Sequence, residues 1–271
     1  MRATLPAPGR SRHRPDAGSG RRPPRPADRS IDRWPYQRGG ATVPGMDEIV
    51  IRDAEPADLR AGAALLAGSL GFADRDAIPA WLMQTAAGCG GIALAAVAGR
   101  ELAGFSFALP ADDRTLFSCG LAVTPSRRGE GLGRRLKLAQ RERALGRGLT
   151  RIRWTADPLA ATALSVYLSG LGARLDAYEP ELYADVRPAP VPPDDVVIDW
   201  HLLGAPAFDP ATVRTVEIPF AHAALHEPER LAWRLRVRDR MCRALDAGLV
   251  GTGVQFDRAT RRSWVLFART A

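Results

Sequence analysis

A strand, a basic glycine-rich loop and a helix follow one another over residues 114–148, and this segment constrains the fold more than any other part of the chain. The strand is the apolar run at 115–123, and the loop after it contains Gly129, Gly131 and Gly133. Glycine allows the backbone to approach a ligand closely, and the first N–H groups of a helix have no partner within that helix. The segment therefore predicts a cradle for an anionic group such as phosphate.

Arginines flank the glycines, and their forked guanidinium groups suit phosphate oxygens. A P-loop would need Lys-Ser or Lys-Thr after the glycines, which is missing here. A dinucleotide-binding fingerprint would need G-x-G-x-x-G and an acidic residue about 20 residues later, and it fits poorly. The observed spacing from Arg128 to Gly133 is instead Arg-x-x-Gly-x-Gly. A glycine-rich turn without a ligand is the alternative interpretation.

This loop, placed between an apolar strand and a helix, resembles the pyrophosphate loop of the GNAT superfamily of acyl-CoA transferases. From about residue 47 to the C-terminus, the chain is similar to a family of predicted bacterial GNAT acetyltransferases that have a C-terminal extension. The runs that carry this similarity lie at 138–145, 154–159, 171–173, 196–200 and 233–236. The resemblance implies a mixed α/β fold, a mostly antiparallel sheet flanked by helices, with a C-terminal α+β extension. It also implies a GNAT-type N-acetyltransferase.

The net charge of +8 is unevenly distributed, and this bears on the class of partner. Residues 1–45 contain ten Arg and three Asp, so this segment carries +7 of the total and the remainder is nearly neutral. A nucleic-acid-binding domain needs a basic face on its folded part. The charge distribution therefore predicts no nucleic-acid partner.

Metal and membrane binding also have little support in the sequence. The three cysteines have no C-x-x-C spacing, and the four histidines form no metal-ligand pattern. No apolar run approaches the 18 residues of a membrane-spanning helix. We therefore expect no metal, no membrane contact and a cytoplasmic location, and the Arg-, Ala-, Gly- and Pro-rich composition indicates a bacterial source.

Proline divides the chain into segments. Residues 1–45 contain eight prolines and little apolar periodicity, which predicts a disordered tail or a mis-assigned start, with translation beginning at Met46. Residues 46–187 are expected to form the GNAT-like domain, and 188–195 a proline-rich hinge. Residues 196–271 are expected to form the extension, packed on the same domain.

Apolar periodicity and turn residues predict the individual elements. In the first helix, after Glu55 and Pro56, Leu59, Ala63, Leu66 and Leu70 form the buried stripe. Expected strands lie at 48–53, 92–98, 102–109, 115–123, 151–156, 173–186, 196–200, 251–257 and 263–268, and expected helices at 56–70, 78–85, 132–147, 160–171 and 227–247. On the last helix, we expect Leu231, Leu235, Cys242 and Leu245 to face the core and the many arginines to face solvent.

The resemblance assigns a binding site for acyl-CoA, with acetyl-CoA as the default co-substrate. In the superfamily the fourth strand splays away from the fifth, and the pantetheine arm lies between them. The residues expected to contact pantetheine are Leu121, Ala122 and Val123. Those expected to hold the pyrophosphate are Arg128, Gly129, Glu130, Gly131, Leu132, Gly133 and Arg134.

Two residues are candidates for catalysis. Many relatives carry a tyrosine four residues before the glycine that ends the helix, but this chain has Leu168 there and Tyr167 one residue earlier. Tyr167 is either a general acid or a core tyrosine. Asp157 either accepts a proton from the amine or caps a helix before Pro158. Cys119 has no evident histidine base, which favours core packing over a nucleophilic role.

The sequence therefore predicts an acyltransferase that moves an acetyl or other small acyl group from acyl-CoA to the amine of a small molecule by direct transfer. Two alternatives remain. One is a CoA-binding module whose catalysis is lost or altered, and the other is a succinyl-type donor with an amino-acid acceptor. A homodimer is left open.

Overall fold

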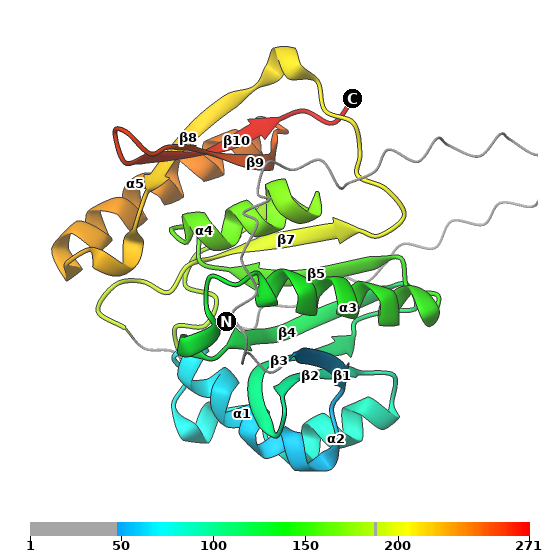
Figure 1. The fold of residues 1–271 in the computed structure, drawn as a ribbon. Helices are drawn as coiled ribbons and strands as arrows, with labels where there is room; N and C mark the ends of the chain where they lie inside the picture. The colour runs from blue at the N-terminus through cyan, green and yellow to red at the C-terminus, as the bar shows by residue number, and fades with distance from the viewer. Residues whose placement is uncertain (1–47, 187–188) are drawn as a thin grey trace, which may run out of the picture. The chain divides into compact units, whose positions relative to one another are not determined.

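Ten strands form one sheet in the part of the chain that the computed structural model describes, residues 48–186 and 189–271 (Figure 1). The strand order is β1-β2-β3-β4-β5-β7-β6-β9-β10-β8, and only β4 and β5 pair in parallel. The strands are β1 Ile49–Asp53, β2 Ile92–Ala98, β3 Glu101–Pro110, β4 Thr115–Val123, β5 Arg151–Ala156, β6 Arg174–Glu179, β7 Asp195–His201, β8 Arg214–Pro219, β9 Val250–Asp257 and β10 Arg262–Ala268. The predicted mostly antiparallel sheet is confirmed. The predicted tail at 1–45 and the predicted start at Met46 lie outside the described residues.

Helices cover the sheet (Figure 1). They also hold in place the strands that form the candidate site. They are α1 Pro56–Leu70, α2 Ala80–Gly88, α3 Leu132–Gly146, α4 Ala161–Leu164 and α5 Glu227–Asp246. α1 and α2 pack with Phe105 and Phe107 in one apolar cluster, whereas α3 and α4 belong to a second cluster. A Cβ at Gly120 would lie 2.9 Å from Leu66 Cδ2, so this glycine allows α1 to approach β4 closely. β4 is thereby held between α1 and α3.

β7 lies between β5 and β6 in the sheet, although it follows both in sequence. β5 pairs with β7 from Arg151 opposite His201 to Ala156 opposite Val196. In the predicted hinge at 188–195, residues 189–194 lead directly into β7, and Asp195 is already the first residue of that strand. The segments before and after the hinge therefore contribute to the same sheet.

A buried carboxylate joins β5, β6 and β7. The Asp199 side chain on β7 has no exposed surface and accepts two hydrogen bonds of 2.6 Å from Arg151 on β5. It also accepts a bond of 2.9 Å from Arg174 on β6. Burial acts to raise the pKa of Asp199, but the hydrogen bonds and charges of Arg151, His201 and Arg174 outweigh burial and lower it to about 2.

We expect the Asp199 carboxylate to make the free energy of unfolding depend on pH in the acid range. Because the folded-state pKa of Asp199 is depressed, its contribution is complete above the ordinary aspartate pKa of 3.8 and is lost as the pH falls through about 2. The contribution is on the order of 1–2 kcal/mol. Urea unfolding of the wild-type chain and of Asp199→Asn over this pH window measures it. A stability difference that stays constant from pH 3.8 down to 2 would contradict the assignment.

Several expected details are wrong. β8 was not predicted, and the strand expected at 173–186 ends at Glu179. On α5, Cys242 and Leu245 pack against the core as expected, but Leu235 is 50% exposed. The buried side chains of this helix are Arg234, Val237 and Met241. The basic side of α5 is therefore partly buried. None of the helices in the described residues combines the length and apolar character that a membrane crossing requires.

Candidate functional site

β4 and β5 separate after three residue pairs, of which the last is Phe117 opposite Arg153. From Ser118 and Trp154 onwards the two strands are not paired with each other, while β4 stays paired with β3 as far as Val123. Because β4 and β5 run in parallel, the gap opens toward the carboxyl ends of both. In the described residues, the edge of β4 that faces the gap therefore has backbone groups outside the sheet ladder.

A β-bulge lies at the start of this gap. Ser118 is opposite Ala108 and Gly120 is opposite Phe107, so Cys119 is the extra residue on β4. Cys119 packs with the α1 side of the core, and burial raises the pKa of its thiol to about 11. The thiol therefore stays protonated, which agrees with the expected packing role.

The three residues expected to contact pantetheine do not face the same way. A Cβ placed on Gly133 of α3 would lie 3.6 Å from Leu121 and 4.0 Å from Val123, so these two side chains face α3. Ala122 is buried in the apolar cluster of α1. A ligand in the gap would therefore meet Ala122 through its backbone only.

The loop from Arg128 to Gly131 ends at the first turn of α3. Gly129 has φ of 84° and Gly131, the N-cap of α3, has φ of 77°. These left-handed conformations favour glycine. No side chain caps α3, so its first N–H groups are available to an anion. Leu132 is buried and can offer only its backbone.

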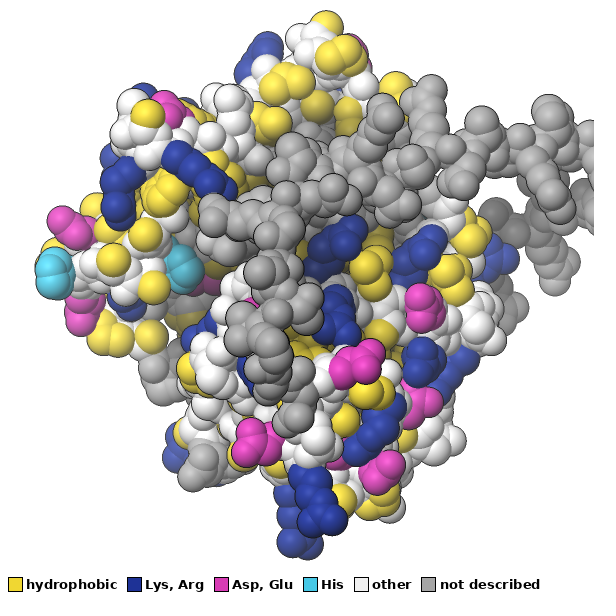
Figure 2. Space-filling view, in the orientation of Figure 1, with side chains coloured by type: hydrophobic (Ala, Val, Ile, Leu, Met, Phe, Trp, Pro, Cys, Tyr) yellow, Lys and Arg dark blue, Asp and Glu magenta, His cyan; other side chains and the backbone are white. Residues whose placement is uncertain are grey.

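Charged side chains of the loop make few strong internal contacts. Arg128 Nε donates to the Val123 carbonyl at 3.2 Å, which folds the side chain back along the end of β4. Arg134 reaches the Gly170 carbonyl only at 3.5 Å. Glu130 lies 4.0 Å from Arg127. On the face drawn in Figure 2, basic and acidic side chains are interspersed.

Tyr167 lies beside the gap but packs within the protein. The predicted helix at 160–171 begins as α4 and continues as a π-helical turn, Ser165–Gly170, which changes the direction of the side chains. The ring of Tyr167 packs edge-on against Trp154 with centroids 5.1 Å apart. Burial raises the pKa of Tyr167, so its hydroxyl stays protonated. Leu168 points into the core.

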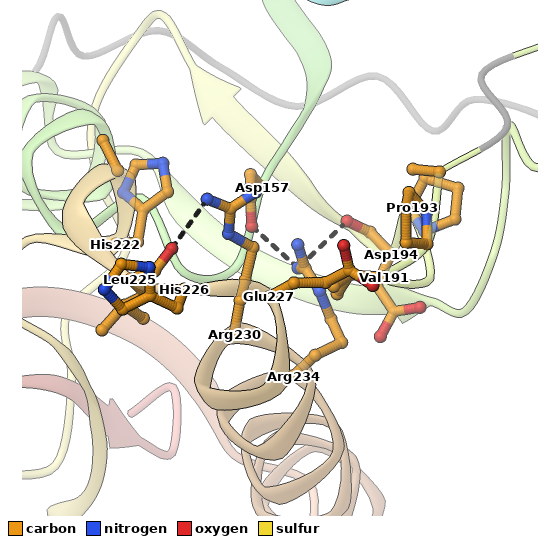
Figure 3. A pocket seen from close by; sticks show the side chains of 13 residues that line it. Asp157, Val191, Pro193, Asp194, His222, Leu225, His226, Glu227, Arg230 and Arg234 are labelled. Atoms are coloured by element: carbon orange, nitrogen blue, oxygen red, sulfur yellow. Dashed lines mark hydrogen bonds and ion pairs between the residues drawn. The ribbon is translucent and has the colours of Figure 1, made fainter.

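Asp157 follows β5 directly and therefore lies on the open side of the gap. Its Oδ1 accepts a hydrogen bond of 2.8 Å from the N–H of Leu159. It accepts a second hydrogen bond, of 2.7 Å, from Nη1 of Arg234 (Figure 3). α4 begins later and has Ala160 as its N-cap, so Asp157 caps the turn before the helix rather than the helix itself. Arg234 is only 4% exposed and also reaches the Asp194 carbonyl at 3.5 Å.

This ion pair forms part of the lining of a cavity of about 750 Å³. Figure 3 shows the side chains that line it. Its walls come from the turn after β5, the segment before β7 and the start of α5. The polar side chains in its lining belong to Asp157, Asp194, His222, His226, Glu227, Arg230 and Arg234. Buried Nε atoms of Arg230 and Arg234 have no hydrogen-bond partner. Sequence reasoning placed these arginines in solvent because a basic run on a helix is usually exposed.

Lys137 is a second residue that sequence reasoning missed. It lies on α3, is 2% exposed, and its Nζ donates to Ser118 Oγ at 2.9 Å. A signal existed, because it is the only lysine in a chain that otherwise uses arginine. Within the described residues, no group of three His, Cys, Asp or Glu side chains is arranged to hold a metal ion.

Residues 66–173 match the model of the Acetyltransferase (GNAT) family. This confirms the predicted resemblance over the segment that contains the loop and the gap. A search of curated protein sequences found no match.

Several solved structures of acetyltransferases are similar to part of this chain. One is yncA, a putative acetyltransferase from Salmonella typhimurium with its cofactor acetyl-CoA, at 17% identity and a TM-score of 0.49, covering 57% of this chain and 94% of that one. Another is the ribosomal-protein-S18-alanine N-acetyltransferase from Escherichia coli, at 18% identity and a TM-score of 0.46, covering 60% and 98%.

Proposed function

We propose that this chain, whose residues 66–173 match the Acetyltransferase (GNAT) family, transfers an acetyl group from acetyl-CoA to the amine of a small molecule by direct attack. The observation that carries the proposal is the separation of β4 and β5 after Phe117, which leaves one edge of β4 open. This edge ends at a glycine loop and an uncapped helix N-terminus. A strand edge suits a ligand with amide groups, and the loop suits its phosphates.

The fit of acetyl-CoA to these residues divides into two parts. Backbone groups of Leu121 to Val123 would pair with the amides of the pantetheine arm, and the first turn of α3 with Arg128 and Arg134 would hold the pyrophosphate. When bound, acetyl-CoA supplies an activated thioester. The protein would orient this group in the gap and exclude water from it.

The cavity beside Asp157 is the proposed acceptor site. Its volume of about 750 Å³ is within the range of small-molecule sites. Asp157 and Glu227 line it and can hold an ammonium group or receive the proton of an amine. The pairing of Asp157 with Arg234 favours one alternative, a CoA-binding module with lost or altered catalysis, because this carboxylate already has a partner.

Calorimetric titration of the full chain with CoA, acetyl-CoA and succinyl-CoA tests the donor site. We expect acetyl-CoA to bind the wild-type chain. The Arg128→Ala variant should bind it about 10-fold more weakly, because a hydrogen bond to a charged group contributes roughly 1.5–3 kcal/mol. Arg143→Met, which removes a charge from the far end of α3, is the control. Absence of binding by a folded wild-type chain would overturn the proposal.

A panel of small amines, with and without a carboxylate, tests the acceptor site in the presence of acetyl-CoA. For an amine that is acetylated, we expect Asp157→Asn to raise KM for the amine about 10-fold and to leave the affinity for acetyl-CoA unchanged. If acetyl-CoA binds but the panel is not acetylated, the CoA-binding module is the better description.

A further inference from the structure

We propose that Lys137 is the acid that protonates the leaving sulfur in the acyl transfer, an inference that rests on the proposed function. Lys137 extends from α3 to the point at which β4 and β5 separate. Its Nζ lies 2.9 Å from Ser118 Oγ and 3.8 Å from the centroid of the Trp154 ring. Ser118 and Trp154 are the first residues of the two strands beyond their last pair. Lys137 therefore lies at the inner end of the gap.

Two side chains that contact Lys137 carry buried hydrogen-bond donors without a partner. Its Nζ is 3.4 Å from Gln140 Oε1, and no carboxylate in the described residues lies within ion-pair distance of it. Gln140 Nε2 and Trp154 Nε1 are buried and have no partner. Buried hydrogen-bond donors normally have an acceptor. Two buried donors without one therefore suit a ligand that brings negative charge. The sulfur that leaves a thioester is such a group.

The protonation behaviour of Lys137 fits this role. Burial lowers its pKa to about 7, and Cys119, the titratable neighbour that would oppose this shift as a thiolate, stays protonated near neutral pH. An acid with a pKa near neutrality transfers its proton readily at neutral pH. A thiol has an ordinary pKa of about 8.5, so transfer from Lys137 to a thiolate is favourable. Tyr167 is a weaker acid, because burial raises its pKa above 10.

In this step, the amine nitrogen of the acceptor forms a bond to the acyl carbon, and the bond between that carbon and sulfur breaks. The ammonium group of Lys137 gives one proton to the sulfur and becomes a neutral amine. The acceptor nitrogen loses one proton to water, and Lys137 takes one proton back from water. No other reactant is needed.

Because Lys137 is the only lysine, a chain grown with lysine labelled with ¹³C at the ε carbon gives a single lysine signal in the NMR spectrum. We expect this signal to titrate near pH 7 in the free chain. Addition of CoA should raise this pKa by about 1 unit, because partial negative charge on the sulfur favours the charged amine, and the value should stay below the ordinary thiol pKa of about 8.5. Desulfo-CoA, which lacks the sulfur, should leave the pKa unchanged.

The result that would overturn the role of Lys137 is a pKa that CoA does not move although calorimetry shows that CoA binds. That result would leave the proposed function intact. Failure of both CoA and desulfo-CoA to bind would overturn the proposed function itself.

Two variants separate a chemical role from a structural one. In the wild-type chain, kcat should fall as the pH rises through the pKa of Lys137, and in Lys137→Met this dependence on pH should be absent. With any amine that is acetylated, we expect kcat of Lys137→Met to fall about 100-fold while KM for acetyl-CoA changes little. Arg143→Met should match the wild-type chain. A wild-type kcat and pH profile in Lys137→Met would overturn the proposal.

Discussion

We expect the Gly131→Val variant to bind acetyl-CoA about 100-fold more weakly than the wild-type chain. Gly131 has φ of 77° and is the N-cap of α3, where the loop turns into the helix. A side chain in the left-handed region costs roughly 1–2 kcal/mol, and a β-branched side chain is especially disfavoured there. The chain would relieve this strain by rotating the loop, which would turn the first N–H groups of α3 away from the phosphates. A 100-fold loss corresponds to about 2.7 kcal/mol.

Isothermal titration with acetyl-CoA measures this effect, and Gly146→Ala is the matched control. Gly146 lies at the other end of α3, lacks a positive φ, and a Cβ placed on it would meet nothing within 4 Å. The control should bind as the wild-type chain does. Unchanged affinity in a folded Gly131→Val chain would show that the phosphates lie elsewhere.

The second large effect concerns stability. We expect Lys137→Met to be more stable than the wild-type chain by several kcal/mol at pH values below 7. Burial lowers the pKa of Lys137 from 10.5 to about 7, a shift that corresponds to roughly 5 kcal/mol of cost for the charged form. Methionine has a similar length and carries no charge to desolvate. Loss of the bonds to Ser118 and Gln140 reduces the gain.

The pH dependence identifies the cause of this gain. Between pH 7 and 10.5 the unfolded chain binds more protons at Lys137 than the folded chain, so the stability of the wild-type chain rises with pH through this window. The advantage of Lys137→Met should therefore be complete below pH 7 and should shrink toward pH 10.5. Urea unfolding across this range measures it. An advantage that does not vary with pH would indicate altered packing instead.

Local patterns in the sequence predicted most of the elements but not every strand. α1 after Glu55 and the β2–β3 pair lie close to their expected positions because periodicity, turn residues and helix caps are local signals. β8 was missed although Val216 and Ile218 alternate with polar residues, since its partner β10 lies far along the chain. Nothing in a six-residue pattern indicates such a distant partner.

The candidate site was predictable at the glycine loop and less so elsewhere. The positive φ at Gly131 follows from a recognisable motif, but the π-helical turn at Ser165–Gly170 has no distinctive sequence pattern. Tyr167 lies within this turn and packs against Trp154, as expected of a core tyrosine. The burial of Arg234 depends on Asp157, which is 77 residues away, so no local rule could distinguish it from exposed arginines on the same helix.

β7 enters the sheet between two strands that the ribosome makes earlier. While β5 and β6 are already outside the ribosome, the place between them is empty until residues 195–201 emerge. During that interval, the edge of β5 away from β4 presents unpaired backbone groups, which can pair with other chains. β5, which forms one side of the gap, thus gains its second partner strand late in synthesis. A nascent chain stalled before β7 should be a substrate for chaperones.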